Sequence, residues 1–137
     1  PKLLSYNRFI EIMPRCLQAL SSFFHQVKGE DTGICIIDST KWVVCHNLRI
    51  KRHRVFKGLA GRGKSSTGWF YGFKVHIVIN NLGEIINLKI TSGSVHDVAV
   101  LESLTQELKG ILLGDKGYLS KAKTEALAAR GLRLLTP

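Results

Sequence analysis

Two short apolar runs, each followed by an aspartate, constrain the fold of this 137-residue chain more than any other feature. Residues 34–37 lead directly into Asp38, and residues 111–114 lead into Asp115. Runs of this length and composition are typical of strands buried within a sheet. In a mixed sheet two such strands can lie side by side and parallel, which brings their carboxyl ends together. The sequence therefore predicts that Asp38 and Asp115 lie close to one another.

Further segments complete an α/β pattern. Residues 69–80 alternate large apolar side chains with small or polar ones, as a strand with one face in the core does. Residues 81–83 form a hairpin turn, and Ser120 can cap a late helix. The order is strand-strand-strand-helix-strand-helix-strand, which predicts a mixed five-stranded sheet with helices on its faces. The strands of this sheet are expected at residues 34–38, 69–80, 85–91, 111–114 and 132–135.

The first part of the chain is predicted to be helical. Ser5 can begin a helix that is kinked or divided at Pro14. We therefore expect an N-terminal helical segment over residues 1–30 and a second unit over residues 31–137. Within that unit a strand is also predicted over residues 43–50, and the glycine-rich residues 51–68 are interpreted as a mobile arm or wide hairpin.

The positive charge is concentrated in one stretch. The whole chain has a formal net charge of +10, and the interval between Asp38 and Glu84 holds nine lysines and arginines with no acidic residue. A local basic surface on an otherwise near-neutral protein indicates a polyphosphate partner. The residues expected to contact DNA are Arg49, Lys51, Arg52, Arg54, Lys57, Arg62, Lys64, Lys74 and His76.

The last two of these residues are on the strand at residues 69–80. We expect its odd-numbered apolar side chains, from Trp69 to Ile79, to face the core, which places Lys74 and His76 on the other face. Two interpretations stay open for this pair: a solvated face, or contact with DNA.

Two carboxylates beside a basic surface suit metal-dependent phosphodiester chemistry. Magnesium takes one or two protein carboxylates together with waters and substrate oxygens. A pair of ions can stabilise the attacking and leaving oxygens. Each aspartate could also be a turn or capping residue. The pairing of Asp38 with Asp115 is what favours the functional interpretation.

Four segments of the chain resemble the bacterial insertion-sequence transposases of the DDE type. They are Asp-Ser-Thr at residues 38–40, the glycine-rich residues 57–66, Gly-Trp-Phe-Tyr-Gly-Phe-Lys-Val-His at residues 68–76, and Gly-Asp-Lys-Gly-Tyr at residues 114–118. The last two blocks are the most specific.

The resemblance implies a ribonuclease H-like fold in which Asp38 and Asp115 are the first two members of a catalytic, metal-binding acidic triad. It also implies two Mg²⁺ or Mn²⁺ ions in the complete enzyme, DNA partners in the form of terminal repeats and target DNA, and a homodimer. The third member of the triad is a glutamate on a helix beyond the fifth strand. Glu125 lies in the preceding helix, so the role is not assigned to it.

A few other residues need an interpretation. Asp97 opens a helix and is expected to cap it, with an outer contact to the metal site as the alternative. The three cysteines, Cys16, Cys35 and Cys45, have neither metal-like nor disulfide-like spacing and are interpreted as reduced. His46, next to Cys45, is interpreted as structural because adjacent strand residues point to opposite faces.

The sequence shows no apolar run long enough to span a membrane and no leader, so we expect a cytoplasmic protein. Pro1 and Pro137 are unusual ends, and we expect a C-terminally truncated chain that binds metal and DNA without transposing. Two other functions stay open. One is a basic nucleic-acid-binding module without catalysis, which salt would weaken but magnesium would not affect. The other is a nuclease of the same fold without strand transfer.

Overall fold

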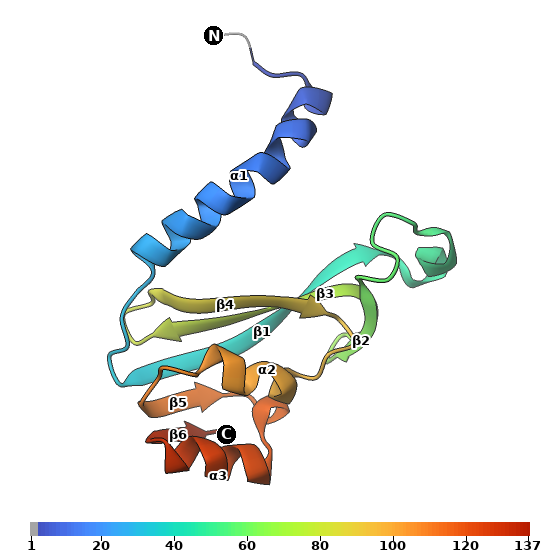
Figure 1. Cartoon of the computed structure of the whole chain (residues 1–137). Coiled ribbons are helices and arrows are strands. Elements are labelled where there is room, and N and C mark those ends of the chain that lie inside the picture. The colour runs from blue at the N-terminus through green and yellow to red at the C-terminus, as the bar shows by residue number, and fades with distance from the viewer. Residues whose placement is uncertain (1–2) are drawn as a thin grey trace.

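The computed structural model describes residues 3–137, so Pro1 lies outside the described residues. The chain begins with a long helix, continues mainly as strands, and then alternates strands with helices (Figure 1). In order they are α1 (Tyr6–Val27), β1 (Ile34–Cys45), the 3₁₀ helix η1 (Asn47–Arg52), β2 (Gly61–Ser65), β3 (Gly68–Asn80), β4 (Ile85–Ser92), α2 (Asp97–Leu104), β5 (Gly110–Gly114), the 3₁₀ helix η2 (Lys116–Tyr118), α3 (Lys121–Ala129) and β6 (Leu132–Leu135).

The strands form one mixed sheet in the order β2-β3-β1-β5-β6, with β4 also paired to β3. β1, β5 and β6 are parallel, whereas β3 is antiparallel to β1, β2 and β4. β2 pairs with the first part of β3 and β4 with the rest, so the two follow one another along the same side of β3. The predicted mixed sheet with its helix crossovers is confirmed, and β2 is a sixth strand within the segment expected to be a loop.

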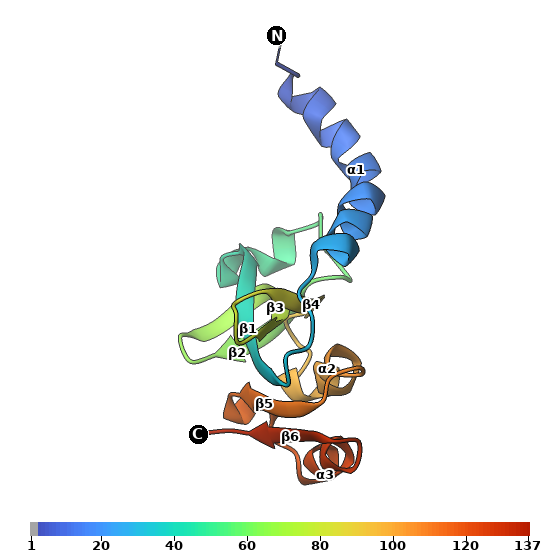
Figure 2. The same ribbon diagram turned by 90° about the vertical axis from the view of Figure 1, so that its left-hand side faces the viewer.

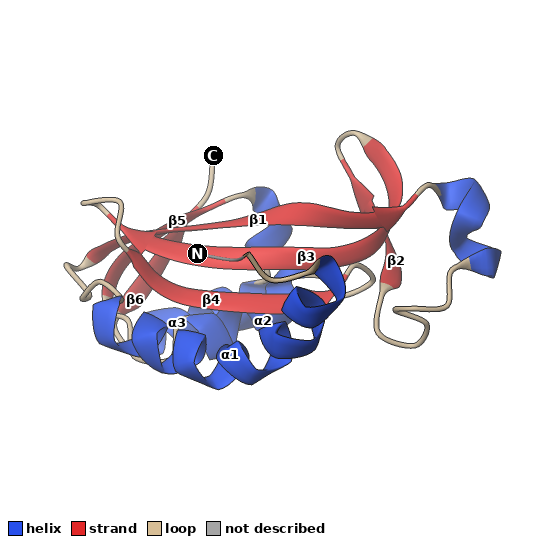
Figure 3. Cartoon of the chain, turned by 90° about the horizontal axis from the view of Figure 1, so that it is seen from above, coloured by secondary structure: helices blue, strands red, loops and turns tan. Residues whose placement is uncertain are grey.

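Helices α2 and α3 lie against one face of the sheet (Figure 3). The core lies between them and the sheet and includes Leu101 and Leu104 of α2, Leu127 of α3, and Leu112 and Leu132 of the sheet, all buried. The opposite face exposes apolar side chains. They include Ile34, Ile36 and Trp42 of β1, Ile90 of β4, and Ile111 and Leu113 of β5.

Two local predictions were wrong. β1 does not stop near Asp38 but continues to Cys45, because β3 pairs with it over this whole length. The segment predicted as a strand at residues 43–50 therefore divides between the end of β1 and η1. Pro14 lies inside α1, a single helix of 22 residues, so of the two predicted forms the divided helix is excluded.

Apart from Tyr71, which is buried as predicted, the orientation of β3 is also the reverse of the prediction. His76, Val78 and Asn80 are buried, whereas Trp69 is exposed. The polar residues are buried because each finds partners: the His76 ring bonds to Tyr118 and Thr91, and the Asn80 amide donates to the Glu30 carbonyl. Satisfied polar groups of this kind can be buried at little cost.

Helix α1 extends away from the sheet, as two perpendicular views show (Figures 1 and 2). It is anchored at its C-terminal end, where the Gly29 N–H donates to the Ile85 carbonyl at 2.9 Å. Among the residues that the structure describes, no helix is long and apolar enough to cross a membrane.

Candidate active site

The parallel pairing of β1 with β5 sets Asp38 beside Asp115. Ile36 pairs with Leu113 and Ile37 with Gly114, so the next residue of each strand is an aspartate. Neighbouring strands lie about 4.8 Å apart. The two carboxylates line one hollow together with Ile36 and Leu113, on the face of the sheet that no helix covers. The structure thus brings together the two residues that the sequence singled out.

Each of these carboxylates is oriented in the same way. The Asp38 Oδ1 accepts from the Ser39 N–H at 2.7 Å, and the Asp115 Oδ1 accepts from the Lys116 N–H at 2.6 Å. Hydrogen bonds to the following backbone fix the side chains and leave acceptor capacity on both. Asp115 also caps η2, so the turn-and-cap interpretation holds in part without competing with the functional one.

A second hollow, of about 190 Å³, opens beside the first and is markedly polar. Asp38 and Asp115 line it together with three lysines, Lys41, Lys64 and Lys74. The Lys41 amine donates to the Thr67 hydroxyl, which holds it beside the β2–β3 turn. Cations next to a carboxylate pair are what a bound phosphate group with its metal ions requires.

Asp97 connects three elements behind the carboxylate pair. Its Oδ1 accepts from the Lys74 ammonium of β3 at 3.0 Å and from the Ser39 hydroxyl of β1 at 3.2 Å. A Cβ placed on Gly117 of η2 would lie 3.0 Å from its Oδ2, so the backbone after Asp115 passes close to it. The N-cap of α2 is His96, whereas Asp97 is the first residue of the helix and its carboxylate bonds to Lys74 and Ser39. The expectation that it caps the helix is therefore wrong.

His76 and Tyr118 lie next to Asp97 and are fully buried. The Tyr118 hydroxyl lies 3.3 Å from His76 Nδ1, and the Thr91 hydroxyl lies 2.9 Å from Nε2. Burial lowers the pKa of His76, against the opposing effect of Asp97 3.8 Å away, and burial raises the pKa of Tyr118. His76 is 0% exposed, so it cannot touch DNA as expected from the sequence. Lys74 is bound to Asp97 and to the Val95 carbonyl.

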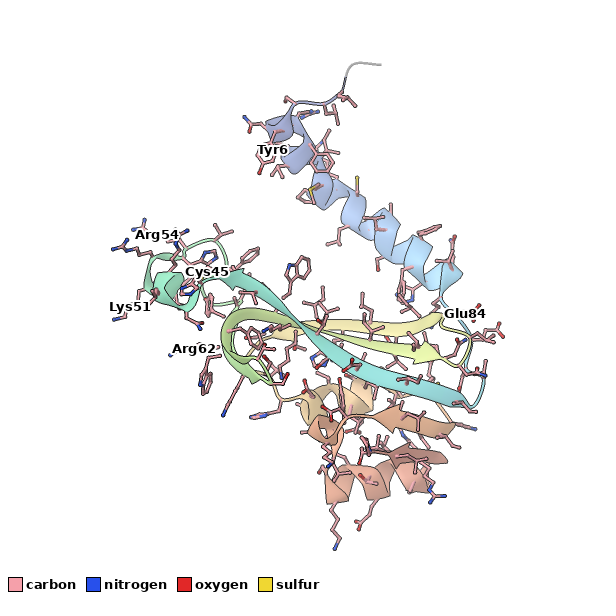
Figure 4. All side chains as sticks on the ribbon, turned by 180° about the vertical axis from the view of Figure 1, so that it is seen from behind. Tyr6, Cys45, Lys51, Arg54, Arg62 and Glu84 are labelled. Atoms are coloured by element: carbon pink, nitrogen blue, oxygen red, sulfur yellow. The ribbon has the colours of Figure 1, made fainter. Side chains whose placement is uncertain are left out.

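The other seven basic residues predicted to bind DNA are exposed. Lys51 and Arg54 lie at the tip of the arm beyond β1, and Arg62 lies at the same end of the molecule (Figure 4). Arg62 and Lys64 flank the exposed Trp69 ring at 5.9 and 6.0 Å from its centre. Within residues 3–137 none of the seven has an ion-pair partner. Their charge is therefore free to meet an anion.

The carboxylate pair suits the first magnesium ion in type and number of ligands. Within the described residues no group of three or more His, Cys, Asp or Glu side chains is placed to hold a metal. Asp97 is neutralised by Lys74, and Glu125 of α3 lines neither hollow. Sequence reasoning missed Ser39 and Tyr118, although both stand inside the blocks that carry the resemblance.

The sheet order and the paired carboxylates define a ribonuclease H-like fold with an acidic site. Residues 28–137 match the family described as Transposase DDE domain, and the chain belongs to that family. Its structure is similar to a chain in the cryo-EM structure of a piggyBac transposase synaptic complex with hairpin DNA, with a TM-score of 0.59 and 12% sequence identity. The match covers 91% of this chain and 27% of that one, so this chain spans about a quarter of the transposase. No curated protein matches the sequence.

Proposed function

We propose that this chain carries the phosphodiester-cleaving and strand-joining site of an insertion-sequence transposase, with Asp38 and Asp115 as metal ligands. The observation that carries the proposal is the register of β1 and β5, in which Ile37 pairs with Gly114, 77 residues further along the chain. This register sets the two following aspartates side by side. Membership of the DDE transposase family supports it. Residues 31–137 would form the catalytic domain and residues 1–30 a helical segment before it.

We assign a different role to each group of residues in the site. Asp38 and Asp115 would hold the metal through the oxygens that their backbone hydrogen bonds leave free. Bound Mg²⁺ or Mn²⁺, two ions in the complete enzyme, would neutralise charge on the reacting phosphate oxygens. Lys41 and Lys64 line the same hollow and would orient the phosphate. Asp97, through Ser39 and Lys74, would act as a positioning residue behind the ligands.

The proposed DNA-binding surface is the basic arm, which we define as residues 46–64. It carries Arg49, Lys51, Arg52, Arg54, Lys57, Arg62 and Lys64, all exposed. The partners would be terminal-repeat and target DNA, bound by a homodimer in the cytoplasm. Most of the binding free energy would be electrostatic and therefore sensitive to salt.

Metal titration of the whole chain tests the proposal. Asp38→Asn removes charge without volume and should weaken Mn²⁺ binding, followed by electron paramagnetic resonance, by at least about tenfold. Glu125→Gln on α3 is the matched control and should leave the titration unchanged. An unchanged titration in Asp38→Asn would make Asp38 a turn residue and favour a DNA-binding module without catalysis. Cleavage of a terminal-repeat substrate without joined products would favour a nuclease.

A further inference from the structure

Helix α1 presents an apolar surface that nothing in the described chain covers. None of its 22 residues is buried. Tyr6 is 78% exposed, Leu17 69% and Phe23 61%, and the helix extends away from the sheet (Figure 2). Exposed apolar surface of this extent on a helix marks an interaction site.

The apolar side chains of α1 follow a coiled-coil repeat. Successive members are separated by steps of four and three residues, without interruption, for three heptads. This 3.5-residue period keeps one seam in line along a supercoiled helix pair. The seam consists of Tyr6, Ile10, Met13, Leu17, Leu20, Phe24 and Val27.

The two flanks of this seam differ. Phe9, Cys16 and Phe23 recur every seven residues along one flank, whereas the other carries Asn7, Pro14 and Ser21. Within α1 neither flank carries a charged side chain, and Arg8 and Glu11 bond to each other at 3.0 Å on the outer surface. The apolar surface is therefore wider on one side than on the other.

We propose that α1 pairs with α1 of a second copy of this chain in an antiparallel coiled coil. With Leu17 packed against Met13 of the second copy, the next layers join Ile10 to Leu20 and Tyr6 to Phe24, so every layer is apolar. The interface is self-complementary, as a two-fold dimer requires. It would supply a contact for the homodimer of the proposed function, and it depends on neither metal nor DNA.

The flanks decide the direction of the pairing. In an antiparallel pair the wide flank of one helix meets the wide flank of the other, which sets Phe9 against Phe23 and Cys16 against Cys16. In a parallel pair the same residues would meet Pro14, Ser21 and Lys28, and the phenyl rings would stay partly in water. The antiparallel arrangement buries more apolar surface.

A second copy fits the surface better than the chain's own sheet does. The uncovered face of the sheet carries Asp38 and Asp115, and α1 lying on it would obstruct the proposed site. The helix pair would contain eight aromatic rings, four from each copy. If each ring buries half of the about 150–250 Å² that an aromatic side chain can bury, their combined buried area approaches the about 1,000 Å² of a stable interface.

The test measures the mass of the whole chain by light scattering, without DNA or metal. The wild-type chain should be a dimer at micromolar concentration, and Leu17→Glu, which puts a charge into the seam, should weaken the dimer at least tenfold. Gln18→Glu, on the outer surface, is the matched control and should stay dimeric. A monomeric wild-type chain, or a dimer that Leu17→Glu leaves intact, would overturn the proposal.

Crosslinking tests the direction of the pair. In a Cys45→Ser variant, a short bismaleimide should join two chains through Cys16, because Cys35 is buried and Cys16 is exposed, whereas Cys45 is half-buried and could react in the wild-type chain. Cys16→Ser should abolish the crosslink and leave the dimer mass unchanged. A dimer that gives no crosslink through Cys16 would overturn the antiparallel register. Because metal binding is measured separately, failure of this proposal is distinguishable from failure of the proposed function.

Discussion

The Lys74 ammonium lies 3.0 Å from the Oδ1 of Asp97 and joins the middle of β3 to the first residue of α2. The same oxygen accepts from Ser39, the residue after Asp38. The side chains of Lys74 and Asp97 are 13% and 23% exposed, so water screens the pair only in part. This ion pair connects the packing of α2 to the position of a proposed metal ligand.

Asp97→Asn should therefore weaken metal binding, although Asp97 itself is not a proposed metal ligand. Lys74 loses its counter-ion and Ser39 a charged acceptor, so we expect Mn²⁺ affinity to fall about tenfold and the free energy of unfolding to fall by about 1–3 kcal/mol. Glu102→Gln, which breaks the more exposed pair with Lys123, is the control and should change both quantities little. Equal Mn²⁺ affinity in Asp97→Asn and wild type would contradict a positioning role.

His76 should make the stability depend on pH. Burial lowers its pKa in the folded chain, so below the ordinary value of about 6.5 the unfolded chain binds a proton that the folded chain does not. The stability that the neutral ring contributes is complete above about pH 6.5 and is lost as the pH falls, with a slope of at most about 1.4 kcal/mol per pH unit. Urea unfolding measured between about pH 7.5 and about pH 5 would test it.

His76→Gln should remove most of this slope, whereas the exposed His96→Gln should keep it. The same pH dependence in His76→Gln and wild type would assign the effect to other groups.

The basic arm should dominate the salt dependence of DNA binding. If it makes about five phosphate contacts, log affinity should fall with log salt at a slope of about −4 to −5. Replacing Arg52, Arg54, Lys57 and Arg62 together with alanine should flatten this slope by about 3–4, measured by fluorescence anisotropy. Alanine at Lys116, Lys121 and Lys123 is the comparison. A larger change in that variant would move the binding surface to η2 and α3.

Gly72→Ala should destabilise the centre of the sheet. A Cβ there would overlap the backbone carbonyl of Trp42 on β1, which cannot move without separating β1 from β3. We expect a loss of about 1–3 kcal/mol or more in urea unfolding. Gly114→Ala would meet the Ile37 Cγ2 at 2.8 Å, a closer contact than normal but with a side-chain atom rather than the backbone, and should cost less than Gly72→Ala. The reverse order of the two losses would contradict this account of the packing.

The amino-acid sequence by itself determined the order of strands and helices, β2 and the end of β1 excepted, and the neighbourhood of Asp38 and Asp115. Apolar runs, turn residues and capping residues act over a few positions, and parallel strands then bring their ends together. The exposed charge of the basic arm could also be predicted, because lysine and arginine are almost never fully buried without a partner and this stretch contains no acidic residue.

Only the tertiary structure decided which face of β3 is buried and what Asp97 contacts. Alternation assigns two faces to a strand but does not say which one the helices cover, and here the buried face carries His76 and Asn80 because Tyr118, Thr91 and Glu30 supply partners. Asp97 meets Lys74 and Ser39 across 23 and 58 residues of chain. Contacts of that range depend on how the sheet and α2 pack, which local sequence patterns do not encode.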